Sequence, residues 1–244
     1  MAEQQRAWLD VPYADKDAAK AAGARWDPEA RRWFAPTRER LAAGLDRWAS
    51  RPPIPATLPG EDRTFGAGLF VDLVPSSCWF TNVRSCIAPA DWTRLRRTVL
   101  ERAGQVCEAC GAGPDRDTGR WLEAHERWAY SERSRADGGP VQTLRRIICL
   151  CTPCHRVTHL GRVITVDGDA AARAAFDHLR AVTGMTDDQA GAHIDAAFTR
   201  WEWRSQLTWA LDVRVLTDAG ITLAAAPAST DRAAAASRTL RTAQ

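Results

Sequence analysis

Residues 107–110 read CEAC, and residues 150–161 read LCTPCHRVTHLG. These stretches contain two Cys-x-x-Cys pairs, Cys107/Cys110 and Cys151/Cys154, and this spacing is typical of a four-sulfur zinc knuckle. The chain between the pairs is long enough for a strand, a loop and a returning strand. The sequence therefore predicts a structural Zn²⁺ that ties the two ends of this insertion together.

The second cysteine pair runs directly into two histidines. His155 and His159 are four residues apart, and the segment that carries them is expected to form a short helix ended by Gly161. Residues at this spacing lie on the same face of a helix, so their imidazoles should point in the same direction.

A third histidine lies between the cysteine pairs. His125 is part of RWLEAHERWAY (120–130), whose alternation predicts a strand, and TLRRIICL (143–150) is expected to return beside it. If this hairpin packs against the helix, three imidazoles meet, and three protein ligands with open positions are typical of a catalytic metal. We therefore expect a catalytic divalent cation, Mg²⁺, Mn²⁺, Ni²⁺ or Zn²⁺, held by His125, His155 and His159.

The composition is that of an ordinary globular protein. At 244 residues and 45% hydrophobic content the chain can hold a sizeable core or two small domains, and it has no apolar run long enough to cross a membrane. Its start lacks the features of a signal peptide, so we expect a cytoplasmic protein without a membrane partner. In that reducing compartment the remaining cysteines, Cys78, Cys86 and Cys149, are expected to be buried apolar side chains. The formal charge of +3 favours a polyanionic partner only weakly.

The expected fold class is α+β, with several units in succession. A small αβ accessory domain precedes a proline-rich linker, a zinc-stapled domain with its lead-in, a helical extension and a tail that is expected to be disordered because it lacks large apolar residues. The predicted bounds are 6–50 for the accessory domain, 51–62 for the linker, 63–166 for the zinc-stapled domain, 167–223 for the extension and 224–244 for the tail.

Two helices have recognisable starts. Asp91 is expected to be the N-cap of a helix that leads to the first cysteine pair, and Thr186 and Gln189 can form a capping box at the start of a long helix. The tryptophan-rich end of that long helix would be a contact for a protein partner if all its indoles are exposed. These are Trp201, Trp203 and Trp209.

The segment 11–36 resembles a small uncharacterised domain with the pattern VPYxxKDxAKxxGARWDxxxxxWxxP. We expect two strand segments around a short helix capped by Asp15, with Trp26 and Trp33 packed inside and a further helix over 37–48. Proteins that carry this pattern are often DNA-processing enzymes. The resemblance therefore implies an accessory contact to nucleic acid or protein.

The motifs CEAC, LEAHERW and LCTPCHRVTHLG together resemble the HNH nuclease family, in its zinc-stapled ββα-metal branch. The resemblance extends over about residues 91–166, and the CxxC/CxxCH frame is its most specific part. It implies a metal-dependent endonuclease that hydrolyses phosphodiester bonds in nucleic acid, with DNA as the expected substrate.

In that family, adjacent residues on the first strand supply a metal ligand and the general base. The pattern matches His125 as ligand and Glu126 as base, whereas a shift by one would make His125 the base and leave Ala124, which cannot ligate, in the ligand position. The sequence therefore leaves open whether His125 or Glu126 is the general base. The family's central Asn is absent from residues 127–150, and Gln142 could replace it in orienting the base or a water.

Four arginines flank the predicted site. Arginine offers paired donors to phosphate oxygens, so these side chains are expected to give nucleic acid a salt-dependent and largely sequence-independent affinity. The alternative is that each belongs to a solvated surface. They are Arg127, Arg145, Arg146 and Arg156.

Two other functions stay open. The zinc hairpin can have kept its shape without catalysis, as the missing Asn suggests, and would then dock on nucleic acid or protein. Alternatively, the chain is a purely structural zinc protein with the tryptophan-rich helix as its contact. Phosphodiester cleavage would distinguish the nuclease from the docking module. A count of two metals per chain, against one, would distinguish it from the purely structural zinc protein.

Overall fold

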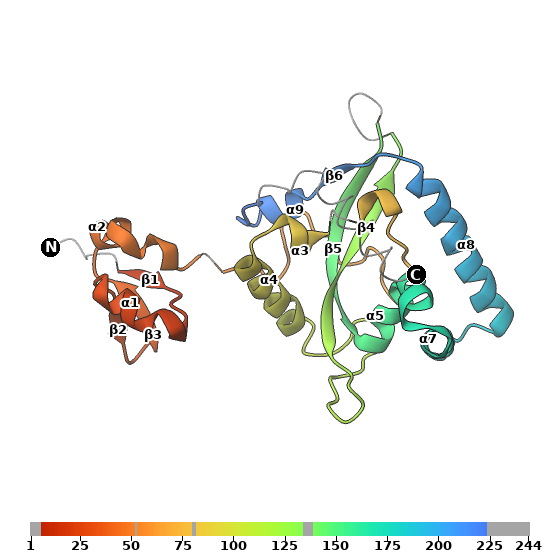
Figure 1. Cartoon of the computed structure of the whole chain (residues 1–244), viewed down its shortest axis with the longest axis horizontal. Helices are drawn as coiled ribbons and strands as arrows, with labels where there is room; N and C mark the ends of the chain where they lie inside the picture. Colours follow the sequence, from red (N-terminus) through yellow and green to blue (C-terminus); the bar gives the residue numbers. More distant parts are fainter. Residues whose placement is uncertain (1–5, 52, 80–81, 134–138, 224–244) are drawn as a thin grey trace. The chain divides into compact units, whose positions relative to one another are not determined.

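The computed structural model shows a mixed α+β architecture with two small sheets, as predicted (Figure 1). The chain divides into two compact units, one up to Pro53 and one from Ile54. The tail expected to be disordered, 224–244, lies outside the described residues. No helix in the described part of the chain is long and apolar enough to cross a membrane. The described residues are 6–51, 53–79, 82–133 and 139–223.

The first unit is a three-stranded antiparallel sheet joined by short helices. The strands lie in the order β1, β3, β2, and small buried alanines allow the first helix to pack closely against them. The elements are β1 (Ala7–Leu9), the 3-10 turn η1 (Tyr13–Asp15), α1 (Lys16–Ala21), β2 (Arg25–Asp27), β3 (Arg32–Ala35), α2 (Arg38–Arg40), η2 (Leu41–Leu45) and η3 (Asp46–Trp48). Its buried core is Leu9, Ala19, Ala24, Ala35, Leu45 and Trp48.

Three predictions for this unit are wrong in detail. Trp26 is half exposed and not part of the core. The helix expected over 37–48 breaks at Gly44, where φ is 125°, a conformation that glycine adopts easily. Asp15 precedes α1, but its carboxylate accepts a hydrogen bond from Nε1 of Trp48 at 3.0 Å and makes no capping bond.

The second unit is built on a long β-hairpin. β4 (Leu122–Ser131) and β5 (Val141–Cys151) pair antiparallel, and the short β6 (Ala210–Asp212) pairs in parallel with the start of β5. The last five residues of β5, IICLC, are all buried, as is usual for an apolar strand covered on both faces. α5 (Thr152–Thr158) follows β5 directly, and Pro153 suits its first turn.

Helices surround the hairpin, with α4 and α8 on opposite sides of it (Figure 1). The capping box of α8 is confirmed, because Thr186 Oγ1 accepts from Gln189 N and Gln189 Oε1 accepts from Thr186 N. The remaining helical elements are η4 (Ser76–Cys78), α3 (Val83–Cys86), α4 (Pro89–Arg102), α6 (Leu160–Arg162), η5 (Val163–Asp167), α7 (Asp169–Thr183), α8 (Asp187–Ser205) and α9 (Arg214–Thr217).

The start of α4 differs from the prediction. The helix begins at Pro89 with Ala88 as its N-cap, because proline is well suited to a first helical position. Asp91 lies inside the first turn, where it is buried and accepts a hydrogen bond from Arg94 at 3.0 Å. Gly104 ends the helix with φ 64°, and the chain then turns into the first cysteine pair.

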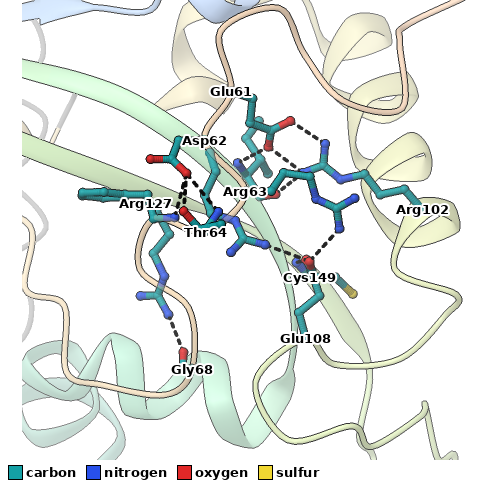
Figure 2. A network of polar contacts seen from close by, with 12 residues as sticks. Glu61, Asp62, Arg63, Thr64, Gly68, Arg102, Glu108, Arg127 and Cys149 are labelled. Atoms are coloured by element: carbon teal, nitrogen blue, oxygen red, sulfur yellow. Dashed lines mark hydrogen bonds and ion pairs between the residues drawn. The ribbon is translucent and has the colours of Figure 1, made fainter.

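The proline-rich stretch is a linker only in its first part. Leu58 is buried in the core of the second unit, and the carboxylate of Glu61 is fully buried against Arg102. Arg102 donates two hydrogen bonds of 2.7 Å to Glu61, which also accepts from the backbone of β5 at Ile147 (Figure 2). A buried carboxylate needs such partners, so residues 54–62 belong to the second unit.

A second carboxylate anchors the first cysteine pair to β5. Glu108 lies between Cys107 and Cys110 and accepts from Arg146 at 2.8 Å and from Cys149 N at 2.7 Å (Figure 2). The loop that carries two of the predicted zinc ligands is therefore held against the strand that carries a third.

Candidate metal centre

The four predicted zinc ligands lie together at one end of the hairpin. Cys107 and Cys110 come from the loop after α4, Cys151 from the end of β5 and Cys154 from α5. Their sulfurs all lie within 4.8 Å of one another, and those of Cys110 and Cys151 are 3.6 Å apart. Four sulfurs at about 2.3 Å from a tetrahedral zinc would be separated by about 3.8 Å. The group could therefore hold a metal ion such as zinc.

The closeness of these sulfurs affects their ionisation. Hydrogen bonds from the thiols of Cys151 and Cys154 lower the pKa of Cys107. The hydrogen bond with Cys107 in turn raises the pKa of Cys151 to about 12, and it raises the pKa of Cys154 as well. The four sulfurs can all be thiolates only beside a cation, and thiolate is the form that binds zinc.

One residue near this group was not expected from the sequence. Nε2 of His178, on α7, lies 3.1 Å from Sγ of Cys154. A ring N–H directed at a metal-bound sulfur would hold that ligand in place. His178 is 24 residues away from Cys154, so no local spacing indicates the contact. The other three cysteines are buried as predicted and lie outside the group.

Three histidines form a second group. His125 comes from β4, His155 from α5 and His159 from the position that ends α5, and their ligand atoms lie within 4.8 Å of one another. The ring centroids are 4.5 to 5.2 Å apart, and each pair of rings is nearly perpendicular. The helix ends at His159 and not at Gly161, but the bond from His159 N to His155 O, 3.0 Å, keeps both imidazoles on one side.

Burial keeps these imidazoles neutral. It lowers the pKa of His155 to about 4 and that of His159 to about 3, and with its two neighbours it holds the pKa of His125 well below the usual value. A neutral imidazole is the form that binds a metal. Nδ1 of His125 is buried and has no hydrogen-bond partner among the described residues, which fits a nitrogen that faces an ion.

A carboxylate that the sequence did not single out supports this group. Oε2 of Glu123 lies 3.2 Å from Nδ1 of His155. In metal sites such a contact fixes the tautomer of the ring and leaves its other nitrogen to bind the ion. Glu123 and His125 are two residues apart on one strand, so their shared face was the signal that could have identified it.

A cavity of about 490 Å³ adjoins the histidine group. His159, Glu126 and Gln142 all line it. Glu126 accepts a hydrogen bond from Val83 N at 3.0 Å, and burial raises the pKa of its carboxyl. Gln142 is buried on β5, and its Nε2 donates to the hydroxyl of Tyr130 at 3.4 Å. The structure thus places Glu126, a candidate base, and Gln142 in the lining of the cavity that His159 also lines.

Two of the arginines predicted to contact nucleic acid cannot do so in this structure. Arg127 is fully buried, and its guanidinium pairs with Asp72 at 3.2 Å and stacks on Phe70 at 4.0 Å. Figure 2 shows the guanidinium also directed at the carbonyl oxygen of Gly68. Arg146 is buried against Glu108. The prediction is wrong for both, because distant carboxylates neutralise them inside the fold.

The other two arginines are accessible. Arg145 is partly exposed and pairs with Asp62 at 3.1 Å, and Arg156 is exposed on α5, one residue after His155.

Of the three tryptophans considered as a protein contact, Trp203 is half exposed whereas Trp201 and Trp209 are partly buried. The condition for a shared exposed surface is therefore not met.

Comparison with known proteins adds two findings. Residues 6–50 match a domain of unknown function, DUF5710. Two Escherichia coli proteins named DNA primase TraC are similar to this chain, one 26% identical over 166 residues (62% of this chain, 14% of the relative) and one 51% identical over 47 residues (19% and 3%). The chain thus spans 14% or less of the length of these relatives. No solved structure matches the chain.

Proposed function

We propose that the second unit is a metal-dependent endonuclease of the HNH type that hydrolyses phosphodiester bonds in DNA. The observation that carries the proposal is the group of three neutral imidazoles, one from the first strand of a hairpin and two from the helix that follows it. Beside it, four sulfurs suited to zinc join the ends of the insertion. This is the arrangement that the resemblance to the zinc-stapled ββα-metal branch implies. The relatives' name, DNA primase, favours DNA over RNA.

In this proposal His125, His155 and His159 hold a divalent cation, and the four cysteines hold a structural Zn²⁺. A bound divalent cation supplies polarisation of the scissile phosphate and stabilisation of the leaving oxygen. The protein's own part is to hold three neutral nitrogens in one place and to leave the cavity side open to substrate.

Glu126 is the better candidate for the general base. His125 lies in the metal-capable group and its ring is buried, whereas Glu126 lines the cavity where a water and a phosphate can enter. A raised pKa makes its carboxylate a stronger base than an exposed glutamate. Gln142 lines the same cavity and would help to orient the water. Arg156 would contact backbone phosphate from α5.

Nicking of supercoiled plasmid tests this function. Wild type, His125→Ala and His155→Ala are compared in Mg²⁺, Mn²⁺ or Ni²⁺, with zinc content measured in each protein. His193→Gln serves as the matched control, because His193, on α8, accepts a hydrogen bond from Val71 N and lies outside the metal-capable group. We expect nicking by wild type and control only. Cleavage that survives both substitutions would exclude the proposed centre.

One alternative has an observation in its favour. The family's central Asn is absent, and Nε2 of Gln142, its candidate replacement, donates to the hydroxyl of Tyr130 at 3.4 Å. A site without this Asn suits a zinc-bound module that docks on nucleic acid or protein without cleaving it. Binding of DNA in a gel-shift assay, with no nicking in any of the three metals, would establish this alternative.

A further inference from the structure

The cavity beside the histidine group has aromatic walls contributed by distant segments. Trp79 follows η4, Trp128 lies on β4, and Phe198 and Trp201 lie on α8. The polar side of the cavity consists of His159, Glu126, Gln142 and Asn82, and exposed residues of η5 form part of its rim. An apolar slot with aromatic walls therefore adjoins the proposed phosphate site at His159.

Two of the three indoles of this slot, those of Trp79 and Trp201, are held by hydrogen bonds. Nε1 of Trp79 and Nε1 of Trp201 both donate to the carbonyl oxygen of Val74, at 3.0 and 3.1 Å. Phe198 contacts Trp201 edge to face, with ring centroids 6.4 Å apart. With their N–H groups already bonded, these indoles offer a ligand their aromatic rings and not a hydrogen-bond donor. Such walls select a planar, polarisable group over a chain-like apolar one.

We propose that the slot receives a nucleobase from single-stranded or locally unpaired nucleic acid. The proposal rests on the proposed nuclease function, because it places the phosphate of the same nucleotide at the histidine group. A base stacked inside a duplex cannot enter such a slot without leaving the helix, so unpaired nucleotides are the favoured substrate class. Each base that stacks on an aromatic side chain contributes affinity with little dependence on its identity.

The charge at the opening agrees with this occupant. Arg162 lines the cavity and its side chain is largely exposed, with its Nη1 3.6 Å from Asp167. His159 also lines the cavity and belongs to the group that would hold a divalent cation. A planar base inside an apolar slot and an anionic phosphate beside cationic groups match the two ends of one nucleotide.

α8 offers a matched pair of substitutions. Trp201 lines the slot, whereas Trp203, two residues along, is half exposed and its Nε1 donates to Glu132. Trp201→Ala removes a wall of the slot, and Trp203→Ala removes an indole of the same size outside it. Val166→Met is a second test variant that keeps Trp201, since Val166 is an exposed residue of the lining where a longer, non-aromatic side chain narrows the opening without disturbing the core.

The experiment measures binding of a short single-stranded DNA that contains one 2-aminopurine, with no divalent metal other than the retained zinc. We expect wild type and Trp203→Ala to quench the fluorescent base equally, and Trp201→Ala and Val166→Met to bind at least about fivefold more weakly. Cleavage in Mn²⁺ is then compared between single-stranded and fully paired DNA, and we expect the single strand to be cut faster.

Failure of this inference and failure of the nuclease proposal give different results. Equal quenching and equal cleavage by Trp201→Ala, Val166→Met and Trp203→Ala would overturn the base slot while the nuclease stands. Quenching that depends on Trp201, with no cleavage in any metal, would support the slot as a base-binding site and reject the nuclease. Faster cutting of paired than of single-stranded DNA would overturn the substrate class.

Discussion

Glu123 and His155 form a carboxylate–imidazole pair, with Oε2 of the first 3.2 Å from Nδ1 of the second. The pair connects β4 to α5, so the strand that carries His125 also orients an imidazole of the helix. In known metal sites, loss of such a supporting carboxylate weakens metal binding by about 10- to 100-fold.

Glu123→Ala is therefore expected to weaken binding of Mn²⁺ or Ni²⁺ by that factor without displacing zinc from the cysteines. Isothermal titration calorimetry of Mn²⁺ or Ni²⁺ into protein that carries one equivalent of zinc measures this affinity. Glu132→Ala is the control, since Glu132 bonds only to Trp203 among the contacts described for it. Equal affinities of the two variants would show that Glu123 does not support the site.

Cys151→Ser is expected to abolish zinc binding and to lower the midpoint of thermal unfolding by more than about 10 °C, because metal affinity contributes directly to folding. Zinc per chain is measured by mass spectrometry. Cys149→Ala is the matched control, since Cys149 is equally buried but lies outside the four-sulfur group. A zinc content of one in the serine variant would contradict the assignment.

Glu126→Gln is expected to lower kcat of plasmid cleavage by about 100-fold or more while metal affinity stays unchanged. Burial raises the pKa of Glu126, and only its carboxylate form can accept a proton, so the wild-type rate should rise with pH through this raised pKa. The glutamine variant should lack this rise. A rise that persists in the variant would assign the titration to another group.

The pH dependence of stability should reflect His155. Its pKa is about 4 in the folded protein against 6.5 ordinarily, so between these values the unfolded chain binds a proton that the native protein does not. Stability should therefore decrease as pH falls from 6.5 towards 4, in protein whose histidine group carries no metal. Urea unfolding of His155→Gln should show a smaller decrease over this window, and an unchanged decrease would contradict the burial of the ring.

The buried pair of Glu61 and Arg102 should be costly to break. Arg102→Met leaves a buried carboxylate without its partner and is expected to cost about 3–5 kcal/mol in denaturant unfolding. Arg97→Met on the same helix is the control, because Arg97 and Glu101 are exposed and 3.8 Å apart, and should cost less than about 1 kcal/mol. Comparable losses of stability in the two variants would show that burial of the ion pair does not determine the cost of breaking it.

Features set by local spacing could be predicted from the sequence. The capping box of Thr186 and Gln189 depends on residues three apart, and the shared side of His155 and His159 depends on residues four apart. The hairpin was predicted because alternation is visible in its first strand and the apolar segment 143–150 could return beside it. The two cysteine pairs could be grouped because each pair has a spacing of its own.

Features set by distant contacts could not be predicted from the sequence. Arg127 and Asp72 are 55 residues apart, and Arg146 and Glu108 are 38 apart, so nothing near either arginine shows that a carboxylate will bury it. Glu61 gave no local sign of burial because its partner lies on α4. The aromatic slot is made by three segments whose proximity depends on the whole fold.

The order of the histidines along the chain has a consequence for synthesis. His125 emerges from the ribosome first. His155 and His159 follow only after the complete hairpin and after Cys154, the last of the four grouped cysteines. A nascent chain stopped before that point holds a single imidazole of the three and cannot gather an ion there. Translation must therefore pass His159 before the group of three imidazoles can form.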